Sequence, residues 1–264
     1  ILNRDIDSYP ILRRAARAAG ARILRFGAGG RPDFRLTEAR LGEGGTVVSA
    51  RIGGQRLIFK LGAPGRHLAL NALAALAAAS AAGADLARAA VALAGWHAPP
   101  GRGARLRIGL GAGEIDGHIT LIDESYNANP ASLGAALEVL AATRPQDDVG
   151  RVARGRRIAV LGDMLELGAE EEEAHRRLAE HPALRAVDRI HCAGPLMKAL
   201  HAALPSCQRG EWFPASEALA ARLPRLIDAG DVIMVKGSLG SRMGRVVDAL
   251  RALGPVSPEP PEEG

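Results

Sequence analysis

The stretch Ile119-Thr120-Leu121-Ile122-Asp123-Glu124-Ser125-Tyr126-Asn127-Ala128-Asn129-Pro130 passes from an apolar run into a polar cluster. Residues 119–122 are typical of a short buried strand, and residues 131–143 have the pattern of a helix. Asn129 suits the N-cap of that helix and Pro130 its first position. Open α/β sheets bind ligands at such turns. For Asn129 alone capping is an equal alternative, but a cap needs neither two adjacent carboxylates nor a second Asn. The turn is therefore predicted to be a ligand site.

The same alternation continues on both sides of this stretch. The predicted strands are 105–108, 118–123, 157–161, 189–193 and 232–235, and the predicted helices are 131–143, 169–180, 195–204, 215–228 and 240–253. Strands that alternate with helices form a largely parallel sheet with right-handed crossovers. We therefore expect an α/β fold with a mostly parallel sheet in the second part of the chain.

The first hundred residues have a different pattern, in which strands follow one another directly. We expect a helix at 11–19, strands at 21–26, 36–40, 46–52 and 56–61, and helices at about 68–82 and 85–94. Pro99-Pro100-Gly101-Arg102-Gly103 is a cluster of helix and strand breakers, which makes it the best domain boundary. The expected division is 1–101 and 102–254. Residues 255–264 are rich in Pro and Glu and are expected to be disordered.

Composition narrows the class of protein. Of the 264 residues, 47% are hydrophobic and 24% charged, as in ordinary globular proteins. Aromatic residues make up only 3%, and the net charge of +5 is spread without a basic run, so we do not expect nucleic acid as a partner. The Ala-rich stretch 68–95 is interrupted by polar residues, so no membrane insertion is expected. Cys192 and Cys207 lack metal-ligand spacing and are expected to be reduced thiols of a cytoplasmic protein. We expect a monomer.

Two further strand ends carry polar groups. They are Leu161-Gly162-Asp163 and Val235-Lys236-Gly237-Ser238. Since the carboxyl ends of parallel strands share one edge, these groups and the opening turn are predicted to converge on one ligand. Lys236 is one of three lysines in an Arg-rich chain, and Arg242 could hold a carboxylate through two hydrogen bonds. The alternatives are a turn carboxylate for Asp163, and surface positions for Lys236 and Arg242.

Polar residues also open the predicted helix near residue 68. His67 and Asn71 are four residues apart and so lie on one helical face, where an amide matches the hydrogen-bonding edge of adenine. The alternatives are a structural amide for Asn71 and a helix-start residue for His67. Glu170 to Glu173, and His175 with them, are interpreted as an ordinary helix start and not as a metal site.

Taken together, these motifs resemble the Mur ligases. The resemblance extends from Ile1 to about Leu253, and its most specific block is Ile122 to Pro130, which is similar to the branch that adds the dipeptide D-alanyl-D-alanine. Ala159 to Gly168 (AVLGDMLELG) and Val235 to Met243 (VKGSLGSRM) resemble further blocks of that branch in the same order. His67 to Ala75 is similar to the family's H-N-x-x-N helix, and Ile1 to Asp5 to the end of a strand in its central domain.

The resemblance implies a fold and an incomplete chain. Mur ligases have an N-terminal substrate domain, a central P-loop ATPase domain and a C-terminal Rossmann-like domain. The chain would hold the last part of the central domain (1–101) and the whole third domain (102–254). It contains no G-x-x-x-x-G-K-[ST] sequence, and its first residue is not Met. We therefore expect a truncated ligase, inactive alone, whose missing part carries the P-loop, the Mg²⁺-binding Glu and a modified Lys.

The resemblance also implies roles for single residues. On the ATP side it places His67, Asn71, Arg102, Asp123 and Glu124. On the side of the incoming dipeptide it places Asn127, Asn129, Lys236, Ser238 and Arg242. Asp163 and Lys236 would be the catalytic residues, and no metal ligand is expected within this chain. The chain departs from the family pattern at Leu68, where Asn is frequent, and at Glu124, where Asp is frequent.

The implied reaction joins D-alanyl-D-alanine to UDP-N-acetylmuramoyl-tripeptide for peptidoglycan synthesis. ATP would phosphorylate the tripeptide carboxylate, and the dipeptide amine would then displace phosphate from the acyl phosphate. Such chemistry depends on positioning and charge neutralisation. Two alternatives are a non-catalytic Rossmann-like binding module and another ligase of the superfamily, such as a folylpolyglutamate synthetase.

Overall fold

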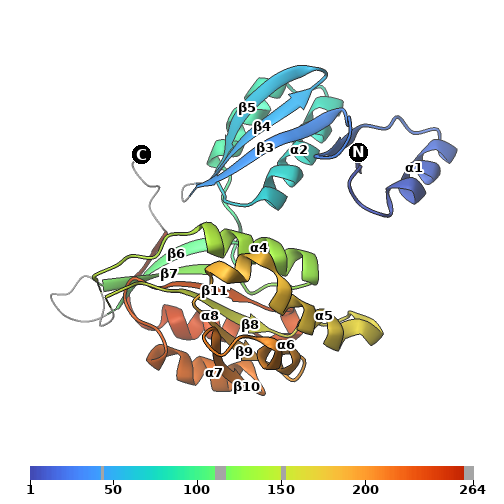
Figure 1. Cartoon of the computed structure of the whole chain (residues 1–264). Coiled ribbons are helices and arrows are strands. Elements are labelled where there is room, and N and C mark those ends of the chain that lie inside the picture. The colour runs from blue at the N-terminus through green and yellow to red at the C-terminus, as the bar shows by residue number, and fades with distance from the viewer. Residues whose placement is uncertain (43–44, 111–116, 150–152, 259–264) are drawn as a thin grey trace. The chain divides into compact units, whose positions relative to one another are not determined.

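The computed structural model describes residues 1–42, 45–110, 117–149 and 153–258. The chain divides into two compact units, residues 1–97 (unit 1) and 98–264 (unit 2) (Figure 1). Each unit has its own sheet.

Unit 1 is built on a five-stranded sheet of order β1-β2-β3-β4-β5. The strands are β1 (Leu2–Asn3), β2 (Arg25–Gly27), β3 (Phe34–Gly42), β4 (Gly45–Ile52) and β5 (Gln55–Leu61). The first three strands are parallel, whereas β3, β4 and β5 form an antiparallel meander, close to the ranges in which the sequence predicted successive strands. Helices α1 (Tyr9–Ala18), α2 (Arg66–Ala81) and α3 (Leu86–Ala92) and the 3-10 helix η1 (Leu93–Gly95) complete the unit. The core forms where α2 contributes Leu73 and Leu76 against the sheet residues Leu36 and Val48.

Unit 2 contains a seven-stranded sheet of order β10-β9-β8-β11-β7-β6-β12. Its strands are β6 (Ala104–Leu110), β7 (Gly117–Glu124), β8 (Arg157–Gly162), β9 (Arg189–Ala193), β10 (Arg209–Phe213), β11 (Val232–Lys236) and β12 (Val256–Pro258). The five strands from β10 to β7 in this order are parallel, and only β6 and β12 run antiparallel to their neighbours. The predicted α/β class with a mostly parallel sheet is therefore confirmed.

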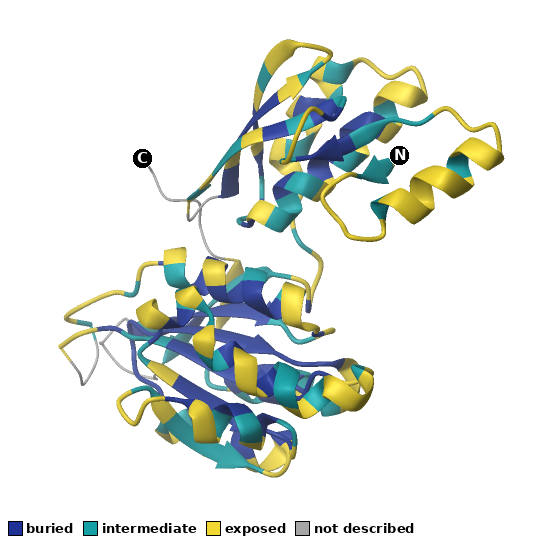
Figure 2. Cartoon of the chain, turned by 45° about the vertical axis from the view of Figure 1, so that its right-hand side comes forward, coloured by how far each residue is buried: buried dark blue, intermediate teal, exposed yellow. Residues whose placement is uncertain are grey.

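Helices cover both faces of this sheet (Figures 1 and 2). They are α4 (Pro130–Ala142), α5 (Glu171–Arg177), α6 (Met197–Ala203), α7 (Ser216–Arg222) and α8 (Gly244–Arg251), with 3-10 segments η2 (Gly168–Glu170), η3 (Leu178–Glu180), η4 (Pro182–Ala186), η5 (Leu223–Arg225) and η6 (Leu239–Ser241). One core cluster joins Leu219 of α7 and Leu250 of α8 to Ile119, Ile158 and Ile233 of the strands. Because both faces are covered, the central strands are largely apolar runs, as expected for parallel sheets.

The structure adds two strands that the sequence pattern did not predict. β10 (Arg209–Phe213) lies at one edge of the sheet, where Arg209 is exposed and the other four residues are half-buried, and its pairing with β9 is irregular between Arg209 and Trp212. Residues 255–264 were expected to be disordered, which is wrong for 256–258. These residues form β12, because the open edge of β6 offers hydrogen bonds to a passing chain. Residues 259–264 lie outside the described part.

Within the described residues, no helix combines the length and the apolar character that crossing a membrane would require. Both cysteines are free thiols. Cys192 is buried in β9, where burial raises its pKa, and Cys207 is exposed.

Candidate functional site

The register of the sheet brings the three polar strand ends together. β11 lies between β7 and β8, and Lys236 at its end is paired with Glu124 on one side and Leu161 on the other. The turn that follows each strand therefore starts from the same edge of unit 2, as the strand pattern predicted. Two of these turns are named below: the amide turn (Ser125–Asn129) after β7, and the Asp163 turn (Asp163–Leu165) after β8.

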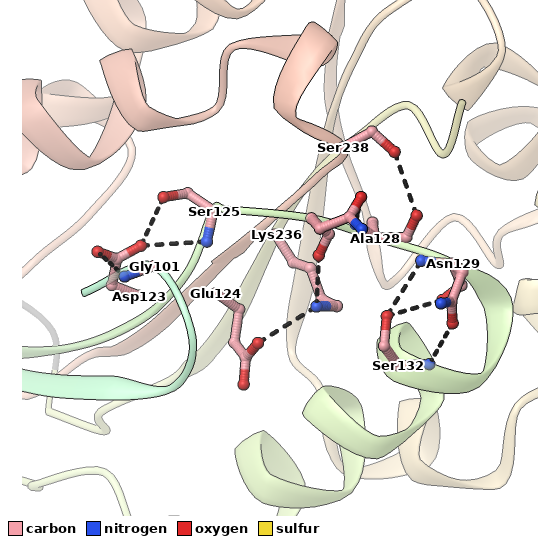
Figure 3. A network of polar contacts seen from close by, with 10 residues as sticks. Gly101, Asp123, Glu124, Ser125, Ala128, Asn129, Ser132, Lys236 and Ser238 are labelled. Atoms are coloured by element: carbon pink, nitrogen blue, oxygen red, sulfur yellow. Dashed lines mark hydrogen bonds and ion pairs between the residues drawn. The ribbon is translucent and has the colours of Figure 1, made fainter. Parts of the chain in front are cut away.

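Asp123, at the end of β7 just before the amide turn, is a buried carboxylate with 5% of its surface exposed. One oxygen accepts a hydrogen bond from the Gly101 N–H at 3.0 Å, and the other accepts from the Ser125 N–H at 3.1 Å and its hydroxyl at 2.6 Å (Figure 3). Asp123 therefore fastens the segment that precedes β6 to the end of β7. The family resemblance had placed Asp123 on the ATP side but had given Ser125 no role.

Glu124, the next residue, has a different environment. Its Oε2 lies 3.2 Å from Lys236 Nζ, and its side chain is 14% exposed. Burial raises the pKa of Glu124 although the Lys236 ammonium acts in the opposite direction. The neighbouring Arg102 guanidinium is exposed and lies 4.1 Å from the centroid of the Tyr126 ring, within the range of a cation–π contact. Arg102, Glu124 and Tyr126 thus give this end of unit 2 both charges and an aromatic face.

The two asparagines of the amide turn are both exposed. Asn129 caps α4, because its Oδ1 accepts from the Ser132 N–H at 2.8 Å while the Ser132 hydroxyl accepts from the Asn129 N–H at 3.0 Å. This reciprocal pair is a capping box, so the capping role considered from the sequence is confirmed. The Asn127 Oδ1 accepts from the Ala128 N–H at 2.9 Å.

Asp163 is buried at the end of β8, with 5% exposure, and its Oδ1 accepts from the Met197 N–H at 2.8 Å. Burial raises the pKa of Asp163, and the N–H groups of Met197 and Leu196 act against that rise. Gly194, at φ +113°, passes beside the carboxylate, and a Cβ there would lie 2.4 Å from it. Only glycine therefore allows the end of β9 to approach Asp163 so closely.

A cavity of about 270 Å³ opens beside the Asp163 turn, at the carboxyl ends of β8, β9 and β10. Its lining residues are Asp163, Leu165, Ala193, Gly194, Pro195, Pro214, Ala215, Ser216, Glu217, Gly240, Ser241 and Arg242. Asp163 supplies a buried carboxylate to this cavity, and Arg242 supplies an exposed guanidinium. The cavity therefore offers groups of opposite charge to a small ligand.

Arg242 has a left-handed backbone conformation, with φ +55° and ψ +35°. Such a conformation is uncommon outside glycine and costs about 1 kcal/mol or more. It is therefore found most often at functional sites, where the backbone fixes the direction of a side chain. Its guanidinium lies 3.8 Å from a carboxylate oxygen of Glu217, which also receives Arg245 at 2.7 Å. The backbone N–H of Glu217 and the nearby Arg245 hold the pKa of Glu217 below its usual range. Glu217 is a cavity residue that the sequence did not suggest.

Lys236, for which a surface position had been the alternative, is buried together with Ser238. They are 2% and 5% exposed; Lys236 donates hydrogen bonds to Glu124 and to the amide turn, and Ser238 is hydrogen-bonded to both turns. The alternative of a surface lysine is therefore wrong for Lys236, because the Glu124 side chain and the Asn127 carbonyl enclose its ammonium.

In unit 1, His67 and Asn71 lie in the first turns of α2, as predicted. Asn71 is exposed and His67 is half-buried. The roles suggested for Asn71, a contact with adenine or a structural amide, therefore stay predictions.

His175 departs most from its sequence interpretation. It is fully buried, its Nε2 accepts from the Met164 N–H at 2.9 Å, and its Nδ1 lies 2.6 Å from the Glu171 carbonyl. His175 therefore holds the backbone of the Asp163 turn through Met164. The nearby Glu172 and Glu173 form ion pairs with Arg176 and Arg177 on the helix surface. In the described part of the chain, no three His, Cys, Asp or Glu side chains gather as a metal site would require.

In unit 2, a mostly parallel sheet with charged groups and a cavity at its carboxyl edge defines an α/β protein with a candidate ligand-binding site. Two protein families match the chain: "Mur ligase middle domain" over residues 1–79 and "Mur ligase, glutamate ligase domain" over residues 110–239. The chain therefore belongs to the Mur ligase family.

Individual relatives agree with this assignment. The UDP-N-acetylmuramoyl-tripeptide–D-alanyl-D-alanine ligase of Escherichia coli K12 is 36% identical over 224 residues, which is 84% of this chain and 45% of that protein. The ligase of the same name from Mycobacterium leprae is 34% identical, over 75% of this chain and 39% of that protein. The crystal structure of MurF ligase from Thermotoga maritima in complex with ADP superimposes with a TM-score of 0.70 at 25% identity, covering 92% of this chain and 51% of that one. The chain thus spans about half the length of these relatives.

Proposed function

We propose that this chain forms the dipeptide-binding part, and one wall of the ATP site, of a ligase that joins D-alanyl-D-alanine to UDP-N-acetylmuramoyl-tripeptide. The similarity to ligases of that name carries the proposal. Within it, residues 1–101 are the end of the central ATP-binding domain and residues 102–254 the C-terminal domain. We expect the ligase to be a cytoplasmic monomer.

The cavity beside the Asp163 turn supports a dipeptide site. D-alanyl-D-alanine is a zwitterion, with an ammonium at one end and a carboxylate at the other. Asp163 suits the ammonium and Arg242 the carboxylate, since charged hydrogen bonds are the strong ones. The volume of about 270 Å³ is near the lower end of the sizes that take small ligands. Asn127 and Asn129, exposed on the neighbouring turn, are further candidates for contact with the peptide.

Each unit has its own candidate nucleotide contacts. In unit 2, Glu124 and Arg102 present a carboxylate and a guanidinium that suit ribose and phosphate. In unit 1, His67 and Asn71 present an imidazole and an amide that suit adenine. The oxygens of Asp123 already accept three hydrogen bonds, so its contribution there is to hold the Gly101 segment beside Arg102. ATP would supply the phosphoryl group that activates the tripeptide carboxylate. We expect the Mg²⁺ ligands in other parts of the ligase.

Calorimetric titration of this chain with modified dipeptides tests the cavity. D-alanyl-D-alanine should bind, N-acetyl-D-alanyl-D-alanine should bind more weakly because it has no ammonium for Asp163, and the dipeptide amide should bind more weakly because it has no carboxylate for Arg242. Equal affinity for all three would contradict the assignment of the two charges.

Turnover in a protein that contains this chain and the other ligase domains tests the reaction. ADP and phosphate should form only when UDP-N-acetylmuramoyl-tripeptide and D-alanyl-D-alanine are both present. Equal turnover with a single amino acid would exclude the dipeptide ligase, and turnover with a folate and glutamate would instead support a folylpolyglutamate synthetase. Dipeptide binding without turnover would favour the non-catalytic binding module.

A further inference from the structure

We propose that Lys236 and Ser238 are positioning residues that fix the amide turn and the Asp163 turn relative to each other. The segment Lys236–Ser238 is called the brace. The inference rests on the proposed function only in its last step, which concerns dipeptide binding. It assigns to Lys236 and Ser238 a role other than contact with substrate.

Sheet register places the brace between the two turns. β11 is hydrogen-bonded to β7 on one side and to β8 on the other, and Lys236 is level with Glu124 and Leu161. The chain that leaves β11 is therefore flanked by the chain that leaves β7 and by the chain that leaves β8.

On the side of the amide turn, the brace donates hydrogen bonds to two consecutive carbonyl groups. Lys236 Nζ donates to the Asn127 oxygen at 2.9 Å, and Ser238 Oγ donates to the Ala128 oxygen at 3.1 Å (Figure 3). Lys236 Nζ also donates to Glu124 Oε2 at 3.2 Å. The backbone of the amide turn is thus held by the two side chains of the brace.

On the side of the Asp163 turn, the brace makes two more bonds. The Leu165 N–H donates to Ser238 Oγ at 2.9 Å, and the Ser238 N–H donates to the backbone carbonyl oxygen of Asp163 at 3.0 Å. A serine hydroxyl has one proton to donate and lone pairs to accept with. Ser238 therefore uses its proton on one turn and a lone pair on the other, so that one oxygen atom joins them.

Burial explains why these residues position and do not bind. Lys236 and Ser238 are 2% and 5% exposed, and the residues lining the cavity include Asp163 and Leu165 but neither member of the pair. Gly237 between them is equally enclosed, because a Cβ there would lie 2.4 Å from Ser241 Oγ and 2.5 Å from Met243 Cγ. The consequence is that the separation between Asn127 and Asp163 is set by the brace.

Amide hydrogen exchange of the chain, measured by mass spectrometry, tests the brace through two variants with different expected patterns. Ser238→Ala should speed exchange in both turns, because it removes the atom that joins them. Lys236→Met should speed exchange in the amide turn and leave the Asp163 turn unchanged. The matched controls are Ser80→Ala and Lys60→Met, which change exposed residues of unit 1. Unchanged exchange in the turns, or faster exchange spread evenly over unit 2, would overturn the proposal.

A chemical measurement on the unaltered chain covers the case in which a variant fails to fold. Lys60, Lys198 and Lys236 are the only lysines, and the first two are exposed. Reductive methylation with formaldehyde should modify Lys60 and Lys198 and leave Lys236 protected, with or without D-alanyl-D-alanine. Methylation of Lys236 at the rate of Lys60 would contradict the brace.

Dipeptide titration then links the brace to the proposed function. If the unaltered chain binds D-alanyl-D-alanine, Ser238→Ala should weaken binding by about tenfold, the equivalent of about 1.4 kcal/mol, without changing a cavity residue. Unchanged affinity in Ser238→Ala would overturn the last step. If the unaltered chain binds no dipeptide, the proposed function fails, while the exchange and methylation results still decide whether the brace exists.

Discussion

Charged groups are buried at both ends of the parallel strands in unit 2, and at the carboxyl end a cavity lies beside them. At the amino end, Asp231 is fully buried and accepts from Arg156 Nη2 at 2.6 Å, from Arg156 Nε at 3.1 Å and from the Asp228 N–H at 2.7 Å. At the carboxyl end, Lys236 is enclosed in a similar way, but Asp163 and Arg242 face a cavity.

This comparison separates buried charge from function. A buried carboxylate whose oxygens all receive protein donors can hold a fold together, and breaking such a pair is costly because the remaining charge loses its partner. Asp163 differs because its carboxylate is part of a cavity wall. A buried charge is therefore a stronger sign of a binding site when a cavity lies beside it.

The largest effect is expected from Asp231→Ala at the amino end. The variant leaves Arg156 without its carboxylate and should lower the free energy of unfolding of unit 2 by about 3 to 5 kcal/mol, while dipeptide affinity stays unchanged. Urea denaturation followed by Trp212 fluorescence, in a Trp96→Phe background, measures the loss. Asp248→Ala, at an exposed position of α8, is the control. A reduced dipeptide affinity in folded Asp231→Ala would break the distinction between the two ends.

His191, in the middle of β9, adds a position remote from both ends. Burial lowers its pKa to about 4, and its Nδ1 accepts from the Glu211 N–H at 3.0 Å. In the unfolded chain the His191 imidazole binds a proton near pH 6.5. Its contribution to the free energy of unfolding is therefore fully present above that pH and is lost as the pH falls toward 4, by up to about 3 kcal/mol. His191→Gln should flatten this part of the pH profile of urea midpoints. A profile that stays as steep in the variant would assign the loss to other groups.

Asp163→Asn sharpens the comparison at the carboxyl end. Because burial raises the pKa of Asp163, the stability linked to this group is present below its unfolded pKa and is lost as the pH rises through its folded pKa. Removal of the charge should therefore not lower stability at pH 8. Dipeptide affinity should fall by about tenfold or more, as expected for a hydrogen bond to a charged group. A loss of stability at pH 8 with unchanged affinity would make Asp163 a structural residue like Asp231.

The smallest effect concerns Asn129, which caps α4 and is also a candidate for substrate contact. Asn129→Ala should cost about 1 kcal/mol because the capping box is lost. Asn129→Asp keeps the capping oxygen and removes the amide N–H₂ group. If the amide contacts the dipeptide, Asn129→Asp should keep the stability and lose affinity. Full affinity in Asn129→Asp would leave capping as the role of Asn129.

The sequence was sufficient for the central strands and helices of unit 2, because buried parallel strands are apolar runs and their helices have strong periodicity. The edge strands β10 and β12 were not predicted. β10 is half-buried and contains Glu211 among its five residues, and β12 is only three residues long and ends at Pro258. Their pairing depends on a neighbouring strand and not on their own pattern.

The site was predictable to the same extent. Residue types and strand ends were enough to gather Asp123, Asp163 and Lys236 at one edge. They could not show that Lys236 is enclosed, because its partners Glu124 and Asn127 are more than a hundred residues away in the chain. The burial of His175 was equally hidden, since its surface-like acidic neighbours gave no sign that its ring meets the Met164 backbone.

The edges of the seven-stranded sheet have a consequence for the pairing of this protein with other chains. An exposed edge strand presents unpaired N–H and C=O groups, which can add strands from other molecules. On one side, β12 covers β6 with three residues and ends at Pro258, which has no N–H to donate. On the other side, β10 is short and irregular in its pairing between Arg209 and Trp212. Among the residues that the structure describes, neither edge offers a long, flat template, so both edges are unfavourable places for a strand of another molecule to pair.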